Sequence, residues 1–124
     1  LLHLTLLTTY LQAAVIDFKA ASEAISPWLL SVRRDLHQYP ELQLACHETS
    51  ARIRSYLRDL DIPYQYPYAE TGVVGRIGKG KPVVALRADI DALPVDEPQG
   101  LHFRSKHEGK MHACGHDGEN TVQC

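Results

Sequence analysis

Residues 83–94 read Val-Val-Ala-Leu-Arg-Ala-Asp-Ile-Asp-Ala-Leu-Pro, an apolar run that passes directly into a polar segment with two aspartates. The apolar part, Val83 to Leu86, has the continuous hydrophobic pattern that is typical of a buried strand. Residues two apart in an extended chain face the same way, so Asp89 and Asp91 are expected to present paired carboxylates beyond the strand. Open α/β sheets bind their ligands at that end, although an isolated pair of this kind more often caps a loop.

The chain before this segment predicts two helices followed by short strands. Ser26 and Pro27 have the pattern of an N-cap and a first helical residue, and residues 28–37 carry an apolar stripe. We therefore expect a helix that starts at Pro27 and ends at Tyr39-Pro40. Helical spacing of apolar residues predicts a second helix over 48–60. The remaining expectations are extended chain at 64–66 and 72–77, a turn at 78–81 and a polar loop at 94–110. This order of elements indicates an α/β sandwich.

A second polar motif, Met-His-Ala-Cys-Gly-His-Asp, occupies residues 111–117. A thiolate from Cys114 and an imidazole from His116, with Gly115 allowing the backbone to turn between them, suit a borderline-soft divalent metal ion. Asp117 could orient one imidazole, as carboxylates often do at such sites. Two ligands do not close a metal site, so the motif alone is more often a coincidence. Cys114 could also be a nucleophile paired with a histidine, but nothing nearby indicates an oxyanion hole or a triad.

Composition excludes several classes of function. A length of 124 residues with 44% hydrophobic and 23% charged residues is typical of one ordinary globular domain. A formal net charge of −2 with scattered Lys and Arg gives no electrostatic reason to expect a nucleic acid or an anionic membrane as partner. Three cysteines without a scaffold-like spacing argue against a disulfide framework. A structural zinc module is disfavoured because no regular spacing links His102, His107 and His112 to the single Cys/His pair.

Taken together, the motifs resemble those of the M20 metallopeptidase family. The resemblance is carried, in order and spacing, by Arg33 to His37, Pro40 to Leu42, Thr71 to Val74, Leu86 to Pro94 and Lys110 to Asp117. Within the family, the chain is similar to the amidohydrolases, which include aminoacylase-like and hippurate hydrolases and the plant enzymes that cleave indole-3-acetic acid–amino acid conjugates. The combination of the two polar motifs is specific, whereas either one alone is weak.

The resemblance implies a fold, a cofactor and a site. The fold is the N-terminal part of a zinc-exopeptidase-like catalytic domain, with helices packed on a mixed β-sheet and the lid or dimerisation domain absent. Cys114 and His116 match metal ligands of the family, and Asp91 matches the aspartate that supports the metal site. Asp89 stands where wider relatives have a ligating histidine, so its role is open. The implied cofactor is a divalent metal ion, and both Mn²⁺ and Zn²⁺ suit such ligands.

The implied reaction is hydrolysis of the amide bond of an N-acyl amino acid, above all an auxin–amino acid conjugate. A water molecule activated by the metal would attack the carbonyl, with a glutamate as general base. The expected partner is thus a small-molecule N-acyl amino acid substrate, and neither a nucleic acid nor a membrane is expected. The resemblance also implies that full-length relatives can form homodimers.

The chain departs from the family pattern after Asp117. Family members continue with Ala or Gly, then His and a helix of small residues, whereas this chain reads Gly-Glu-Asn-Thr-Val-Gln-Cys. We therefore expect residues 26–117 to be a partial catalytic domain and residues 118–124 to be an aberrant tail from a frameshift, a retained intron or an assembly error. The general base and the remaining metal ligands are expected beyond this tail.

The N-terminal residues 1–25 are expected to be a signal remnant or an N-terminal helix. Leu1 to Val15 is apolar with scattered threonines, which fits either interpretation, and it is too short and too polar for a transmembrane span. A signal remnant would place the protein in the lumen of the endoplasmic reticulum, and a helix would leave it in the cytoplasm.

Two functions follow from different classes. The first is a metal-dependent amidohydrolase of which these residues are a fragment. The second is a truncated, non-enzymatic product that binds at most one metal ion weakly. Under both, we expect the 124-residue chain alone not to hydrolyse an N-acyl amino acid, because a hydrolytic metal site needs three or more protein ligands and a base.

Overall fold

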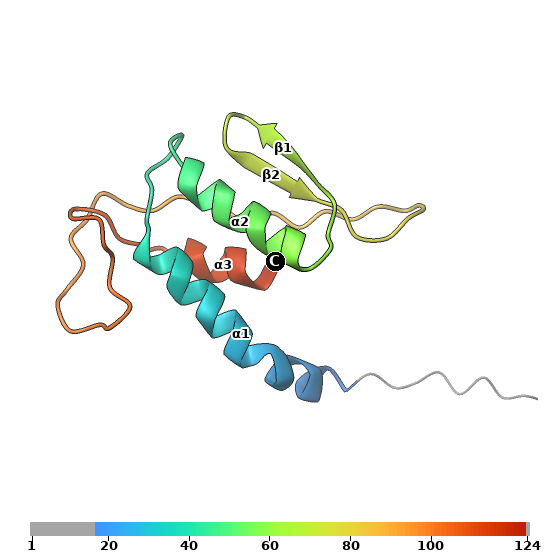
Figure 1. The fold of residues 1–124 in the computed structure, drawn as a ribbon, viewed down its shortest axis with the longest axis horizontal. Helices are drawn as coiled ribbons and strands as arrows, with labels where there is room; N and C mark the ends of the chain where they lie inside the picture. Colours follow the sequence, from blue (N-terminus) through green and yellow to red (C-terminus); the bar gives the residue numbers. More distant parts are fainter. Residues whose placement is uncertain (1–16, 124) are drawn as a thin grey trace, which may run out of the picture.

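The computed structural model describes residues 17–123, which form three helices and a short hairpin (Figure 1). The helices are α1 (Phe18–Gln38), α2 (His47–Asp59) and α3 (His116–Gln123), and the strands are β1 (Tyr64–Tyr68) and β2 (Gly72–Gly75). The first and third helices pack together, and β2 packs on α2. The α/β class expected from the sequence is confirmed as helices combined with a small antiparallel sheet.

Helix α1 begins nine residues before the expected start. Asp17 is its N-cap, and the Asp17 side chain accepts a hydrogen bond from the Ala20 amide at 3.0 Å. The expected start at Ser26-Pro27 is therefore wrong, because Pro27 lies inside the helix. Several alanines between 18 and 25 favour helix and explain the longer element. The expected domain boundary at 25/26 falls within α1, while Leu1 to Val15 lies outside the described residues.

Helix α2 and the two strands agree with the sequence predictions, whereas the pairing of the strands as a hairpin was not predicted. The observed helix is displaced by one residue from the expected 48–60, and β1 and β2 begin at the expected positions 64 and 72. Glu41 supplies acceptors for the free backbone amides in the first turn of α2. Its carboxylate accepts hydrogen bonds from the amides of Glu48 and Thr49 at 3.1 and 2.7 Å. The strands pair antiparallel, with Tyr64 opposite Gly75.

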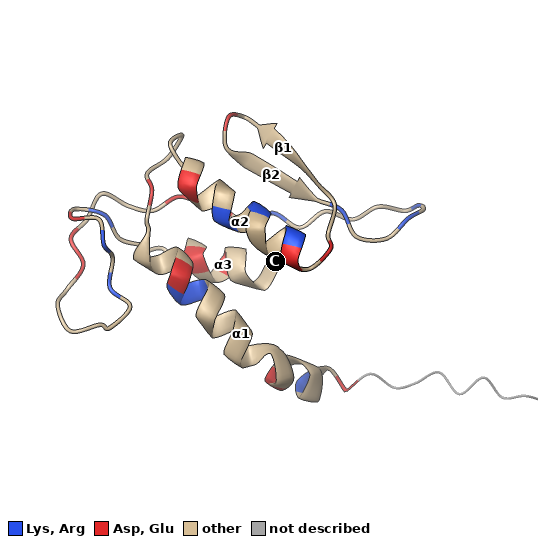
Figure 2. Ribbon diagram, viewed as in Figure 1, with Lys and Arg blue, Asp and Glu red and all other residues tan. Residues whose placement is uncertain are grey.

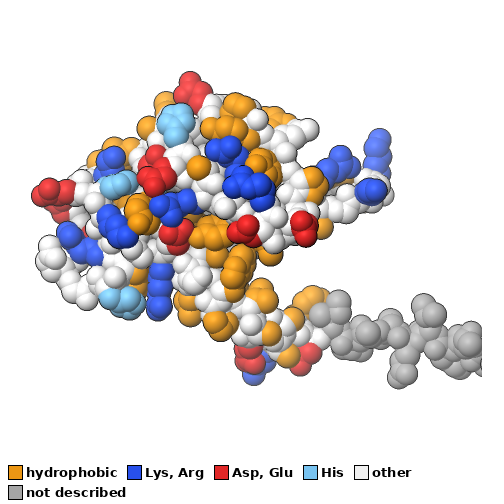
Figure 3. All heavy atoms as spheres, in the orientation of Figure 1, with side chains coloured by type: hydrophobic (Ala, Val, Ile, Leu, Met, Phe, Trp, Pro, Cys, Tyr) orange, Lys and Arg blue, Asp and Glu red, His pale blue; other side chains and the backbone are white. Residues whose placement is uncertain are grey.

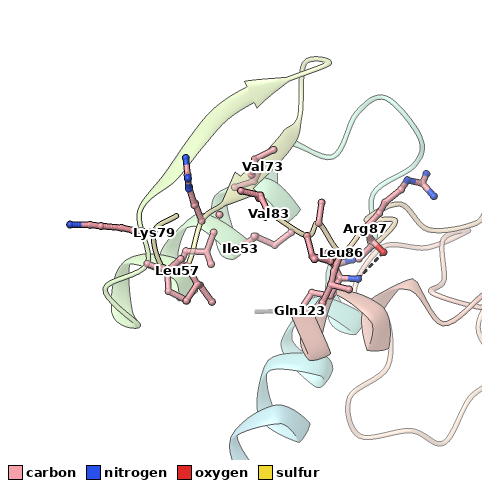
Figure 4. Close-up of a pocket in the computed structure, with 18 of the residues that line it drawn as sticks. Ile53, Leu57, Val73, Lys79, Val83, Leu86, Arg87 and Gln123 are labelled. Carbon is pink, nitrogen blue, oxygen red and sulfur yellow. Dashed lines mark hydrogen bonds between the residues drawn. The ribbon is translucent and has the colours of Figure 1, made fainter. Parts of the chain in front are cut away.

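Residues 83–86 contradict the sequence prediction. They form no strand, and Val84 and Leu86 are 84% and 81% exposed. An apolar run becomes a strand only when a neighbouring strand supplies hydrogen bonds, and the only sheet within residues 17–123 is the β1–β2 pair. The segment instead lines a cavity of about 810 Å³ opposite Ile53 and Leu57 of α2 (Figure 4).

Helix α3 was not expected from the sequence. It follows Gly115, whose φ of +98° lies in the left-handed region that glycine adopts without a steric penalty. Asn120 and Thr121 are buried, and the Thr121 hydroxyl donates to the Asp117 carbonyl at 2.7 Å. The expected boundary at 117/118 therefore lies inside a packed helix.

The buried apolar core is small. It consists of Val32 and Leu36 from α1, Ile53 and Leu57 from α2, and Cys46 and Ala92 from connecting segments. Apolar side chains remain exposed along α1 on the face drawn in Figure 3. Charged residues of both signs are interspersed along the helices and loops (Figure 2). Within residues 17–123, no helix has the length and apolar character that a bilayer crossing requires.

Candidate metal site

Two backbone bridges bring the two polar motifs together. The Ala92 amide donates to the Glu41 carbonyl at 2.8 Å, which ties the first motif to the segment that precedes α2. Leu93 and Met111 exchange two backbone hydrogen bonds of 3.0 and 3.1 Å. Because Asp91 lies just before these bridges, the tertiary structure places it beside the second motif.

Asp91 holds the imidazole of His116. The Nδ1 atom of His116 lies 2.9 Å from the Asp91 carbonyl oxygen and 3.0 Å from its Oδ1. Both partners are acceptors, so Nδ1 carries the proton and donates it, which leaves Nε2 with an open lone pair when the ring is neutral. Burial lowers the pKa of His116, but the hydrogen bonds to Asp91 outweigh it and raise the pKa above the ordinary value. The expected proximity of Asp91 to this histidine is confirmed.

The donor atoms at this site suit a divalent metal ion. Cys114 is an exposed free thiol two residues before His116, and Gly115 between them makes the left-handed turn. A thiol, an imidazole nitrogen that has no proton and a carboxylate bonded to the other nitrogen of that ring are the groups found at zinc-type sites. Within the described part of the chain, no three His, Cys, Asp or Glu side chains form a group that could hold a metal ion. The metal roles of Cys114 and His116 remain predictions.

Asp89 lies near the site but is engaged elsewhere. Its carboxylate pairs with the guanidinium of Arg87, and its carbonyl oxygen accepts a hydrogen bond from the side chain of Asn120. It lines a cavity of about 520 Å³ together with Asp91 and His116. The two aspartates therefore have different partners, although their spacing in the sequence suggests a pair.

Asp117 is fully buried and orients a histidine that lies 80 residues away in sequence. Its Oδ2 atom lies 2.9 Å from Nδ1 of His37 and accepts a hydrogen bond from Nε of Arg33 at 3.2 Å. A contact between the Asp117 carboxylate and an imidazole was expected from the sequence, but not with His37. A usable signal was present, since Arg33 and His37 are four residues apart and thus lie on one face of α1.

Glu97 completes this buried cluster and was missed in the sequence, where it falls in the polar loop. Its Oε1 lies 2.8 Å from Nε2 of His37, and its Oε2 accepts the amide hydrogen of Ser105. Burial raises the pKa of Glu97, but the hydrogen bonds from His37 and Ser105 outweigh it and lower the pKa below its usual range. No local pattern distinguishes this glutamate from the other acidic residues of the loop.

Among residues 17–123, His112 is buried without a hydrogen-bond partner. It is 5% exposed, and neither of its ring nitrogens is bonded within the described residues. Burial lowers the pKa of His112, because the charged form of the ring loses its solvation. His112 lies in a loop, as expected from the sequence, but its burial was not expected.

Comparisons with known proteins agree on one family. Residues 85–122 match the model of peptidase family M20/M25/M40. The chain is 48% identical over 116 residues to an Arabidopsis thaliana protein named IAA-amino acid hydrolase ILR1-like 2, an alignment that covers 93% of this chain and 26% of that protein. It is also 48% identical over 101 residues to a Bacillus subtilis N-acetylcysteine deacetylase, covering 78% of this chain and 26% of the relative.

Among solved structures, the fold is similar to that of the Bacillus subtilis YxeP protein, described as a dinuclear metal-binding peptidase from the M20 family. The TM-score is 0.74 at 44% sequence identity, and the match covers 80% of this chain and 28% of that structure. The chain therefore spans about a quarter of the length of the relatives that it matches.

Proposed function

Because this chain belongs to peptidase family M20/M25/M40, we propose that the protein carrying it is a metal-dependent amidohydrolase acting on N-acyl amino acids. The observation that carries this proposal is the contact between Asp91 and Nδ1 of His116, because it leaves Nε2 of the same ring free to bind a metal ion. The exposed thiol of Cys114 lies two residues before His116 in the sequence. Relatives with amide-hydrolysing names support the same class of reaction.

The proposal assigns a role to each side chain at the site. The sulfur of Cys114 and Nε2 of His116 would hold a divalent cation, with Mn²⁺ and Zn²⁺ as the candidates that suit this donor set. A bound cation would polarise the amide carbonyl and lower the pKa of a water molecule. Asp91 keeps the imidazole in one tautomer and one orientation, and its negative charge makes Nε2 a better donor to a cation.

For the substrate, we propose an indole-3-acetyl amino acid, in keeping with the name of the Arabidopsis relative. An N-acetyl amino acid is the competing substrate, because the Bacillus relative is named as an N-acetylcysteine deacetylase. The two differ in the size of the acyl group and share the amide and the amino-acid carboxylate. A direct comparison of turnover therefore separates them.

The test uses the protein that contains this chain, purified and stripped of metal. Release of the amino acid is measured from indole-3-acetyl and N-acetyl substrates, before and after addition of Mn²⁺ or Zn²⁺. We expect turnover only with metal, loss of turnover in Cys114→Ser and His116→Gln, and retention in the control His47→Gln, which alters an exposed histidine on α2. Metal-independent turnover, or full activity in Cys114→Ser, would overturn the proposal. Complete inactivity would favour the non-enzymatic alternative.

A further inference from the structure

Three segments that are far apart in sequence meet at the side chain of His37. Its Nδ1 lies 2.9 Å from Asp117 Oδ2, and its Nε2 lies 2.8 Å from Glu97 Oε1. The side chains of all three residues are at most 5% exposed. The histidine belongs to the last turn of α1, the aspartate to the first turn of α3, and the glutamate to the loop between the two polar motifs.

The chemistry of the contacts makes the ring a link between two anions. Carboxylate oxygens only accept hydrogen bonds, so His37 fills both contacts when each ring nitrogen carries a proton. Arg33 donates a further hydrogen bond to Asp117, so that its guanidinium partly compensates the charge of this buried carboxylate. Buried charges require such compensation, and hydrogen bonds between ionised partners are short and directional.

Each carboxylate is connected through the backbone to one side of the candidate metal site. Asp117 directly follows His116, so the hydrogen bond that fixes its carboxylate also restrains the start of α3, which carries the imidazole. On the other side, the Glu97 carbonyl accepts a hydrogen bond from Arg104 at 2.9 Å, which fastens the loop that leads into the Leu93–Met111 bridge. That bridge lies two residues from Asp91.

We infer that His37 is a positioning residue, which holds Asp117 and Glu97 together and thereby sets the Asp91–His116 geometry that aims Nε2 at a metal ion. This inference rests on the proposed function for the identity of the ligand. The geometric part stands separately, because the contact between Asp91 and His116 is measurable without metal. Neither His37 nor Glu97 contacts the metal or the substrate in this assignment.

The experiment compares the full chain with its His37→Gln variant. Glutamine has similar polarity but offers one donor and one acceptor group, so it can satisfy only one of the two carboxylates. The matched control is His47→Gln, the same substitution at an exposed helical histidine. Long-range ¹H–¹⁵N spectra of the histidine rings in alkaline buffer report which nitrogen of His116 is protonated, with His116→Gln used for assignment. Co²⁺ alone is then titrated, and the thiolate-to-cobalt absorption band reports binding at Cys114.

We expect the wild-type chain and the control to show His116 protonated at Nδ1, and His37→Gln to lose this single-tautomer signal. Co²⁺ affinity should fall about ten-fold or more, the size of effect typical when a group behind a metal ligand is removed. An unchanged His116 signal and unchanged Co²⁺ affinity in a folded His37→Gln chain would show that the histidine serves only the core, and would overturn the inference. If the His116 signal changes in His37→Gln while neither the wild type nor any variant binds Co²⁺, the positioning role stands and the metal proposal fails.

A second variant decides the matter if His37→Gln does not fold. Glu97→Gln preserves the shape of the cluster and an acceptor for Nε2 of His37, but removes one of the two negative charges. We expect a folded chain with a partial loss of the His116 signal and a smaller loss of Co²⁺ affinity. Wild-type behaviour in both measurements would count against the positioning role.

Discussion

Nδ1 of His116 lies 3.0 Å from Oδ1 of Asp91 and 2.9 Å from the carbonyl oxygen of the same residue. One residue therefore supplies both acceptors to a single ring nitrogen. The imidazole cannot rotate about its bond to Cβ without losing both hydrogen bonds, so the direction of Nε2 is defined before any metal binds. The two residues are separated by 25 positions in sequence.

Replacement of Asp91 by Asn should lower the pKa of His116. The amide oxygen still accepts a hydrogen bond, but the carboxylate charge that favours the imidazolium is lost. Since the folded pKa of His116 is raised, its interaction with Asp91 stabilises the chain fully below 6.5, and the contribution is lost as pH rises through the folded pKa. An NMR titration of His116 measures the change, with Asp59→Asn at the exposed end of α2 as the control. An unshifted titration in Asp91→Asn would refute the assigned cause.

The buried His112 should make stability depend on pH in the opposite direction. Its folded pKa is lowered, so the unfolded chain binds more protons just below 6.5, and the free energy of unfolding falls as pH drops through this range. His112→Leu should remove the contribution of this histidine to the fall in unfolding free energy at low pH. It should also leave stability at neutral pH unchanged or raise it by about 1 kcal/mol, because two buried unpartnered nitrogens disappear.

Urea unfolding of the wild type and His112→Leu at several pH values measures the difference between the two curves. His47→Leu, at an exposed position, serves as the control and should retain the wild-type slope. Parallel curves for the wild type and His112→Leu would mean that His112 titrates normally in the folded chain.

The thiols of Cys114 and Cys46 should react at very different rates. Cys114 is exposed, whereas Cys46 is buried, and burial raises the pKa of Cys46 to about 11. Because the thiolate is the reactive form, a disulfide reagent should modify Cys114 first and Cys46 only after unfolding. With Cys124 replaced by Ser, two thiols remain and the two phases can be counted. Zn²⁺ should slow only the fast phase, and a fast phase insensitive to Zn²⁺ would argue against Cys114 as a ligand.

Truncation of Leu36 and Leu86 to Ala should separate the real core from the expected one. Leu36 is 2% exposed and Leu86 is 81% exposed. Leu36→Ala should cost about 2–5 kcal/mol of unfolding free energy, because it removes buried methyl groups and leaves a cavity. Leu86→Ala should change stability by less than about 0.5 kcal/mol. Denaturant unfolding of both variants gives the comparison, and equal losses would indicate that residues 83–86 are buried after all.

Local patterns in the sequence determined the elements whose contacts are local. Helix α2 follows from apolar residues at helical spacing, and the two strands follow from extended runs, although their pairing was not predicted. Gly115 is in the left-handed region, as expected for a turn between Cys114 and His116. The proximity of Asp91 to the second motif was anticipated because the family resemblance carries tertiary information that spacing does not.

Tertiary structure decided the features that depend on distant partners. The run at 83–86 has the composition of a strand, but composition cannot supply the neighbouring strand whose amides and carbonyls it must bond. The local signal at Ser26-Pro27 also predicted the wrong start for α1, because Asp17 rather than Ser26 caps it. His37 meets partners 60 and 80 residues away. The spacing of Arg33 and His37 indicates a shared face of α1, but it does not identify Asp117 or Glu97 as the partner. A short segment determines which way a side chain faces, whereas only the folded chain determines which group it meets.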